Sequence, residues 1–170
     1  MTNNDLIDSL IIEWKRERPD LDTSAMSIVG RILLLGKALE KRANKTVSAL
    51  NIHYTDLDVL ATIRRSGKPY ELTPSQLMKS VLISSGAMTA LLNRLTKLEL
   101  IYRASNPKDG RVKLVGITEK GIRIIDEAIV LRMAEAIESI SALNDSEEKQ
   151  LSFLLKKLLS SLNNPHEVCK

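Results

Sequence analysis

One segment interrupts the helical pattern of this 170-residue chain and limits the folds that it can form. Residues 101–117 hold two strand-like runs, IYRAS and VKLVGI, separated by the turn sequence NPKDGR. Helical periodicity precedes and follows this segment. Because a lone β-hairpin is marginally stable in water, one face of this hairpin is expected to pack on the neighbouring helices.

Two short helices with marked starts precede the hairpin. Thr73, Pro74 and Gln76 supply an N-cap, a preset first position and a capping-box partner. The sequence ISSG then opens another helix start almost at once. Two short helices and a hairpin in this order predict a winged helix-turn-helix. The second helix is apolar on one side, with Met88, Leu91, Leu92, Leu95 and Leu98, and polar on the other, with Ser85, Thr89, Asn93, Arg94 and Lys97.

Further helices are predicted on the N-terminal side. Apolar spacing indicates one helix over about residues 4–17 and another from about residue 23 to residue 45. A short third helix is expected from an N-cap at Thr55, with Asp58 three residues later, and the sequence SGKPY ends it.

Two long helices are predicted after the hairpin. Thr118 caps the first, which carries an apolar stripe to near Leu143, and NDSE starts the second, whose leucines continue to Leu162. The winged helix is too small to cover both stripes. The N-terminal helix and a second protomer are therefore the expected cover, which predicts a homodimer.

The charge distribution indicates where a nucleic acid would bind. Residues 55–121 hold 11 Lys and Arg against 6 Asp and Glu, whereas the rest of the chain holds 14 against 15. All of the net charge of +4 thus comes from the central segment, as expected if that segment contacts phosphates. The hairpin turn adds Lys108 and Arg111 at its tip, and such cations suit a narrow minor groove of double-stranded DNA.

The sequence does not have the features of a membrane protein or a secreted protein. The longest apolar run, ILLLG, is far shorter than the roughly 20 residues of a membrane span, and the N-terminus lacks the pattern of a signal peptide. The single cysteine, Cys169, cannot form an intrachain disulfide, so we expect a cytoplasmic protein without a membrane partner.

The sequence also lacks the residue patterns that catalysis and metal binding require. His53 and His166 are far apart, and no metalloprotease, phosphate-loop or serine-nucleophile motif is present. We expect no enzyme, no cofactor and no metal site. Two alternatives stay open at this point: a metal- or redox-responsive regulator of the same fold, and a helical protein-interaction module without DNA binding.

The central motifs resemble those of the MarR family of bacterial winged-helix transcription regulators. Residues 84–121 contain the turn NPKDGR and the exit VKLVGIT, which are similar to the wing of that family, with Asn106 in place of the usual first Asp. Residues 56–80 are similar to its two preceding helices. The resemblance covers most of the chain, and it implies a mainly α fold with a small β-hairpin wing and dimerisation helices on both sides.

The resemblance also implies a function and a set of DNA-binding residues. Members are homodimers whose recognition helices, residues 84–98 here, enter successive major grooves of a pseudo-palindromic operator. Asp109 would orient the guanidinium of Arg111 toward the minor groove. Ala90 departs from the Arg or Asn of many members, which leaves more of the readout to other residues. The implied DNA-binding set is Ser84, Ser85, Thr89, Asn93, Arg94, Lys108, Asp109 and Arg111.

Members commonly respond to a small aromatic or anionic effector, which implies a ligand-responsive repressor. The candidate effector residues are Trp14, Arg31, His53 and Asp58. Taken individually, a Trp at the end of an apolar stripe is more often a core residue, and Arg31 could be the partner of an acidic residue. The domain organisation expected is N-terminal support helices in residues 1–54, a DNA-binding lobe in 55–118 and C-terminal dimerisation helices in 119–170.

Overall fold

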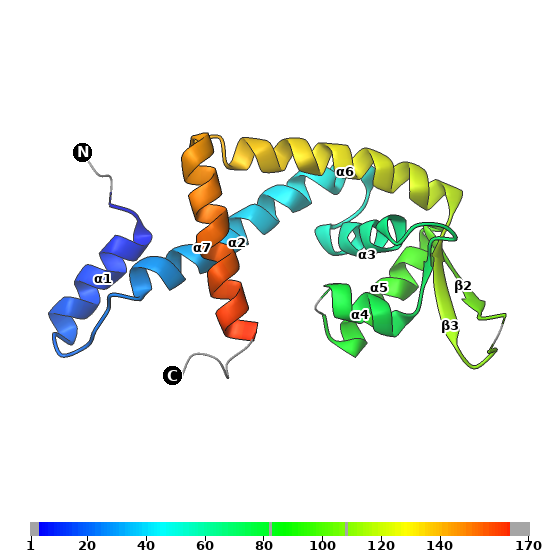
Figure 1. Cartoon of the computed structure of the whole chain (residues 1–170), viewed down its shortest axis with the longest axis horizontal. Helices are drawn as coiled ribbons and strands as arrows, with labels where there is room; N and C mark the ends of the chain where they lie inside the picture. Colours follow the sequence, from blue (N-terminus) through cyan, green and yellow to red (C-terminus); the bar gives the residue numbers. More distant parts are fainter. Residues whose placement is uncertain (1–3, 82, 108, 164–170) are drawn as a thin grey trace. The chain divides into compact units, whose positions relative to one another are not determined.

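The computed structural model describes residues 4–81, 83–107 and 109–163 (Figure 1). It is mainly helical with a small antiparallel sheet, which confirms the predicted fold class. It divides into two compact units, one up to Arg132 and one from Met133, so the boundary lies within α6. The elements are α1 (Leu6–Glu17), α2 (Met26–Val47), η1 (Ser48–Leu50), α3 (Tyr54–Arg65), β1 (Glu71–Leu72), α4 (Pro74–Val81), α5 (Ser85–Lys97), β2 (Ile101–Ser105), β3 (Lys113–Ile117), α6 (Glu119–Ser139) and α7 (Asp145–Asn163).

The two N-terminal helices are held together by a buried contact and an ion-pair cluster. Asp5 caps α1 by accepting hydrogen bonds from the N–H groups of Ile7 and Asp8 at 2.8 and 3.0 Å. Ile7 is buried against α2, where a Cβ at Gly30 would lie only 2.7 Å from Ile7 Cδ1. Arg31 of α2 pairs with Asp5 and Asp8 at 2.8 and 2.6 Å. The small size of Gly30 therefore permits the close approach that these ion pairs require.

The start of α3 differs from the prediction, which placed the cap at Thr55. The N-cap is His53, whose N–H donates to Asp56 Oδ2 at 2.8 Å. Tyr54 also donates its N–H to Asn44 Oδ1 at 2.9 Å, and this bond ties the beginning of α3 to α2. The helix starts earlier because these two partners satisfy its first N–H groups.

The starts of α4 and α5 confirm the predicted caps. Thr73 N–H donates to Gln76 Oε1 at 2.8 Å, and Gln76 N–H donates to Thr73 Oγ1 at 3.2 Å, which is a capping box. Ser84 Oγ accepts the N–H of Ala87 at 3.3 Å at the start of α5. The two helices of the predicted helix-turn-helix are thus set by local sequence.

The sheet has three strands in the order β1-β3-β2, where the sequence predicted a two-stranded hairpin. Strand β1 is only two residues long, so it carries too little pattern to be recognised. Glu71 and Tyr102 lie on either side of Gly116 in the central strand, and Tyr102 Oη donates to Glu71 Oε1 at 2.8 Å. A Cβ at Gly116 would lie 2.2 Å from the Tyr102 ring, so a larger residue there would displace the ring from its present position.

One apolar core joins α3, α4, α5, the sheet and the first part of α6. Its residues are aliphatic or methionine, as expected from the 3% aromatic content. Ile125 and Ala128 show that α6 contributes directly to this core. Because α5 and the wing share this core, their positions are fixed relative to each other. Its buried members are Val47, Ile52, Leu57, Val59, Leu60, Ile63, Leu77, Met88, Leu91, Leu92, Leu95, Leu100, Ile101, Val115, Ile117, Ile125 and Ala128.

The C-terminal helices also begin at the predicted residues. Thr118 Oγ1 accepts the N–H of Gly121 at 3.0 Å at the start of α6. Asn144 Oδ1 accepts the N–H groups of Ser146 and Glu147 at 3.0 and 3.1 Å at the start of α7. The end of α6, at Ser139, precedes the predicted end because tighter turns follow it. No described helix is long and apolar enough to cross a membrane.

Candidate nucleic-acid interface

Helix α5 presents a polar row to solvent and an apolar row to the core. Ser85, Thr89 and Asn93 are exposed and follow one another at intervals of four residues, so they share one face. Thr89 Oγ1 donates to the C=O of Ser85 at 3.0 Å, whereas the Ser84 hydroxyl caps the helix. The structure therefore brings three of the predicted DNA-binding residues onto one accessible surface.

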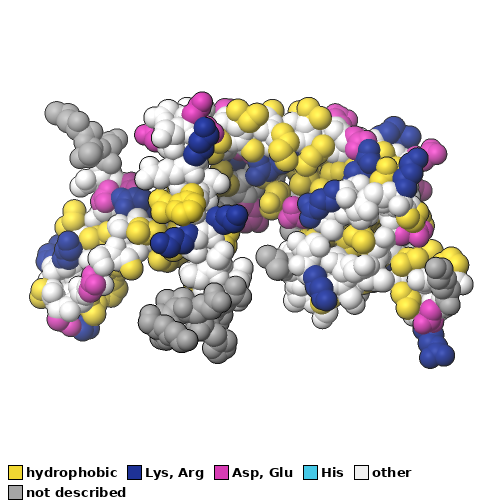
Figure 2. Space-filling model, viewed as in Figure 1, with side chains coloured by type: hydrophobic (Ala, Val, Ile, Leu, Met, Phe, Trp, Pro, Cys, Tyr) yellow, Lys and Arg dark blue, Asp and Glu magenta, His cyan; other side chains and the backbone are white. Residues whose placement is uncertain are grey.

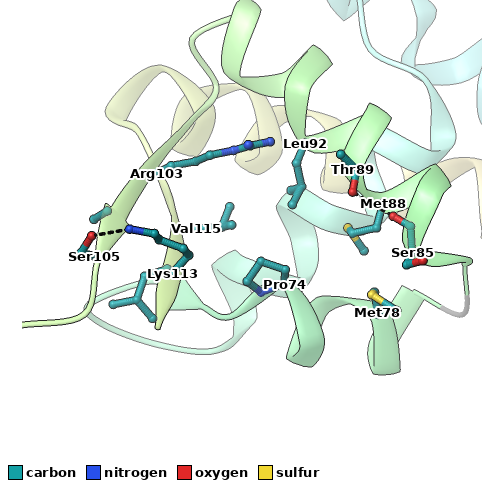
Figure 3. A pocket seen from close by; sticks show the side chains of 12 residues that line it. Pro74, Met78, Ser85, Met88, Thr89, Leu92, Arg103, Ser105, Lys113 and Val115 are labelled. Atoms are coloured by element: carbon teal, nitrogen blue, oxygen red, sulfur yellow. Dashed lines mark hydrogen bonds between the residues drawn. The ribbon is translucent and has the colours of Figure 1, made fainter. Parts of the chain in front are cut away.

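A wing residue that the sequence did not single out orients Asn93. Arg103 of β2 extends toward α5 (Figure 3), and its Nη2 donates to Asn93 Oδ1 at 2.8 Å. A guanidinium can only donate, so the amide oxygen faces Arg103 and the amide NH₂ points elsewhere. Asn93 would thus present a hydrogen-bond donor to a ligand. This contact could not be predicted from the sequence because ten residues and a change of element separate the two side chains.

Arg94 does not share the exposed row but anchors α5 to α3. Its Nε lies 3.1 Å from Oδ2 of Asp56, whose side chain is fully buried while that of Arg94 is 41% exposed. Oδ1 of Asp56 is buried and has no hydrogen-bond partner in the described structure. The Arg94 charge therefore compensates a carboxylate in the core, and a direct role for Arg94 on DNA stays a prediction.

Arg94→Met is expected to lower the free energy of unfolding by about 2–3 kcal/mol, because it leaves the Asp56 carboxylate buried without its cation. This expected loss of stability is smaller than the loss for a fully buried ion pair, because solvent partly screens the charge of Arg94. Urea unfolding followed by circular dichroism measures it. The control is Lys97→Met, which removes a charge from an exposed position of the same helix. Equal stability of the two variants would show that the ion pair contributes little.

The tip of the wing is held by backbone and side-chain hydrogen bonds. Asp109 Oδ1 accepts the N–H of Arg111 at 3.0 Å, and the C=O of Asp109 accepts the N–H of Val112 at 2.9 Å. Both Asp109 and Arg111 are exposed. The carboxylate thus holds the backbone of the turn, whereas its predicted action on the Arg111 guanidinium stays a prediction. Figure 2 shows a basic patch next to an acidic one at the end of this hairpin.

A pocket of about 510 Å³ lies between α4, α5 and the sheet (Figure 3). Its floor is apolar, with Met88, Leu92 and Val115, and its rim is polar, with Thr89 and Arg103 among its residues. The pocket adjoins both elements that are predicted to contact DNA. Sequence reasoning missed it because its lining comes from four separate elements.

The four predicted effector residues fall into two pairs. Trp14 of α1 is 47% exposed, and Arg31 of α2 is already bound by two carboxylates. His53 caps α3 and Asp58 lies one turn further along that helix. Among the residues that the structure describes, no hydrogen bond or ion pair joins Trp14 or Arg31 to His53 or Asp58. A shared effector site stays a prediction.

Asp58 has an environment that differs from that of an ordinary surface carboxylate. Burial raises its pKa above the usual value, and the nearby charges of Arg65 and Arg132 partly oppose this shift. Carboxylates with a perturbed pKa occur often at functional sites, and ion-pair networks with a purely structural role also contain them. An effector role for Asp58 stays a prediction.

Three residues named in the sequence analysis lie outside the described residues: Lys108, His166 and Cys169. Within residues 4–81, 83–107 and 109–163, no group of three or more His, Cys, Asp or Glu side chains is placed to hold a metal ion.

Comparisons with known proteins point to one family. The sequence model of the MarR family matches residues 50–112 of the chain. The regulator PecS of Dickeya dadantii is 26% identical over 158 residues, which cover 93% of this chain and 95% of PecS. The multiple antibiotic resistance protein MarR of Salmonella typhimurium is 31% identical over 133 residues, covering 77% and 90%. A mutant MarR from E. coli complexed with operator DNA has a TM-score of 0.71 at 27% identity, covering 92% and 99%.

Proposed function

Since the chain belongs to the MarR family and is a DNA-binding transcriptional regulator, we propose that it is a ligand-responsive repressor that binds a pseudo-palindromic operator as a homodimer. The observation that carries the proposal is the exposed polar row of α5 beside a hairpin that ends in an exposed Arg111. The related proteins are transcriptional regulators and not enzymes.

We propose that α5 enters the major groove and the wing reaches the adjacent minor groove. Ser85, Thr89 and Asn93 have the hydroxyl and amide groups that read base edges. Arg111 supplies the cation that a narrow minor groove attracts. The operator-bound structure of E. coli MarR supports this docking, because the chain is similar to that protein over most of its length.

Exposed apolar side chains support a homodimer. Helices α1, α6 and α7 carry large hydrophobic side chains at the surface, and Figure 2 shows part of them. Monomeric proteins rarely expose apolar patches larger than a few hundred Å². A two-fold dimer would place two recognition helices about one turn of DNA apart. The exposed set includes Leu6, Ile12, Val130, Met133, Ile137, Leu151, Phe153, Leu154, Leu158, Leu159 and Leu162.

The roles of the three chain segments follow from this proposal. Residues 55–118 would bind DNA, whereas residues 1–54 and 119–170 would support the lobe and form the dimer. The first part of α6 packs in the core of the DNA-binding lobe, so this helix would serve both segments.

We further propose that a small aromatic or anionic effector weakens operator binding. The candidate residues are Trp14, Arg31, His53 and Asp58, and the perturbed carboxylate of Asp58 supports the last of them. A ligand can shift the protein only by binding one conformation more tightly than the other. The effector must therefore prefer a dimer in which the recognition helices are wrongly spaced.

Phenolic, purine and salicylate-like compounds are the first effectors to test. An active compound is expected to quench the fluorescence of Trp14, which is the only tryptophan, and to weaken operator binding at the same concentrations. Fluorescence titration and a mobility-shift assay measure the two effects. Trp14→Phe is the control for the optical signal, because it removes the fluorophore and keeps an aromatic ring. If no compound changes either quantity, the proposed effector residues are wrong.

Selection from random duplex DNA tests the proposed function as a whole. The purified protein is expected to enrich a sequence with two inverted half-sites whose centres are about 10 base pairs apart. Mapping that sequence to a genome would then identify the regulated genes. Enrichment of no sequence over several rounds would contradict sequence-specific binding.

A further inference from the structure

A single arginine at the end of α3 joins three parts of the DNA-binding lobe. Arg64 forms a bidentate ion pair with Asp126 of α6, with Nε–Oδ1 and Nη2–Oδ2 distances of 2.9 and 3.2 Å. Its remaining nitrogen, Nη1, donates to the hydroxyl of Tyr70 at 3.0 Å. The guanidinium carbon also lies 5.0 Å from the centre of the Tyr70 ring. All three guanidinium nitrogens of Arg64 therefore donate a hydrogen bond.

Tyr70 extends this cluster to the wing. Its C=O accepts the N–H of Ile117 at 3.3 Å, so the residue before β1 is bonded to the central strand of the sheet. Its backbone has φ of 61°, which the surrounding bonds must hold in place. Arg64 thus contacts a helix of the lobe, the edge of the wing sheet and α6.

Asp126 lies where α6 leaves the core of the lobe. Ile125 and Ala128 are buried in that core, and Asp126 is partly exposed beside them. The helix continues beyond this point to Ser139 as one element. The buried residues fix how deeply α6 sits in the lobe, and the ion pair restrains its rotation at the rim.

This cluster fixes the relative orientation of the elements more than it stabilises the fold. The side chains of Arg64 and Asp126 are 36% and 48% exposed, and ion pairs with this exposure stabilise folded proteins little. A bidentate pair nevertheless fixes both distance and plane, because the guanidinium and carboxylate forks match. A residue of this kind is suited to setting an angle between two elements.

We propose that Arg64 is a positioning residue that fixes the angle between the winged-helix lobe and α6, and thereby the spacing of the two recognition helices in the dimer. The spacing part of this inference rests on the proposed function, since it requires a dimer that binds two half-sites. The angle itself lies within one chain and can be measured without DNA.

The first measurement is a distance distribution between spin labels at Lys97 of α5 and Glu127 of α6. Both positions are exposed, and Cys169→Ser removes the native thiol. Labelled chains are diluted with unlabelled ones so that only distances within a chain are seen. The wild-type distribution is expected to be narrow and that of Arg64→Met broader. Equal widths would overturn the proposal.

The second measurement is affinity for duplexes whose half-site spacing is changed by one or two base pairs. Wild-type protein is expected to prefer one spacing sharply. Arg64→Met is expected to bind that duplex about 10-fold more weakly and to lose most of its preference among spacings. The matched control is Arg65→Met, which removes the same charge from a side chain bonded to Thr62 within α3. The control should keep the wild-type spacing profile.

The outcomes separate this inference from the proposed function. If the wild-type protein binds no duplex, the proposed function fails, and the label distances still decide whether Arg64 fixes the angle. If Arg64→Met loses affinity equally at all spacings, the positioning role is overturned. Asp126→Asn provides a second variant, because it keeps the side-chain size and removes the charge. It should reproduce the flattened profile with a far-ultraviolet spectrum and dimer mass like those of the wild type.

Discussion

Replacing Leu154 and Leu158 of α7 with glutamate is expected to give a monomer that no longer binds operator DNA. The two side chains are 47% and 42% exposed and lie one turn apart, so they belong to one surface. Burying a leucine contributes about 1.5–3 kcal/mol, and a glutamate in its place adds the cost of desolvating a charge. Glutamate and leucine have similar helix propensities, so α7 itself should persist.

Sedimentation velocity at micromolar concentration measures the expected change in mass, and a mobility-shift assay measures the loss of binding. The control variant carries Gln150→Glu and Ser161→Glu, which add the same charge at exposed polar positions of α7. It should remain dimeric. A double leucine variant that stays dimeric would place the dimer interface elsewhere.

Arg111→Ala is expected to weaken operator binding by about 1–3 kcal/mol and to reduce the salt dependence of log affinity by about one in slope. In the wild-type protein the exposed Arg111 side chain would place a cation in the minor groove, and the alanine variant lacks it. Folding should change little. Asp109→Ala should cause a smaller loss, because it removes the bond that holds the backbone of the turn and leaves the arginine charge in place.

Thr89→Ala provides the contrast for the wing variant. A residue that reads base edges should weaken the preferred operator more than random DNA, whereas Arg111→Ala should weaken both. Fluorescence anisotropy over a series of salt concentrations measures both variants. Wild-type affinity of Arg111→Ala at every salt concentration would show that the hairpin tip is an ordinary surface turn.

Local sequence was sufficient to predict the helix starts and the wing. Thr73, Ser84 and Thr118 each accept a hydrogen bond from the N–H group three residues later, so their roles follow from short-range rules. The hairpin was recognisable because its turn and both strands are contiguous. These features also placed Ser85, Thr89 and Asn93 on one helical face.

Features that depend on tertiary contacts could not be predicted. Strand β1 exists because it pairs with β3, and two residues have no periodicity of their own. The start of α3 depends on Asn44, which lies ten residues before Tyr54. The sequence predicts that Arg94 faces DNA, because it is basic and lies on the recognition helix. In the structure Arg94 instead pairs with the carboxylate of Asp56, 38 residues earlier. Such pairings are set by packing and leave no mark in a single sequence.

The most direct test of a dimeric, sequence-specific regulator is a titration of the wild-type protein with the selected operator and with a scrambled duplex of the same composition. At physiological salt, the operator is expected to bind about 10³-fold more tightly or better, with two chains per duplex. Binding to the scrambled duplex should fall steeply as salt increases, because it rests on phosphate contacts alone. Equal affinity for the two duplexes, or one chain per operator, would contradict the proposed function.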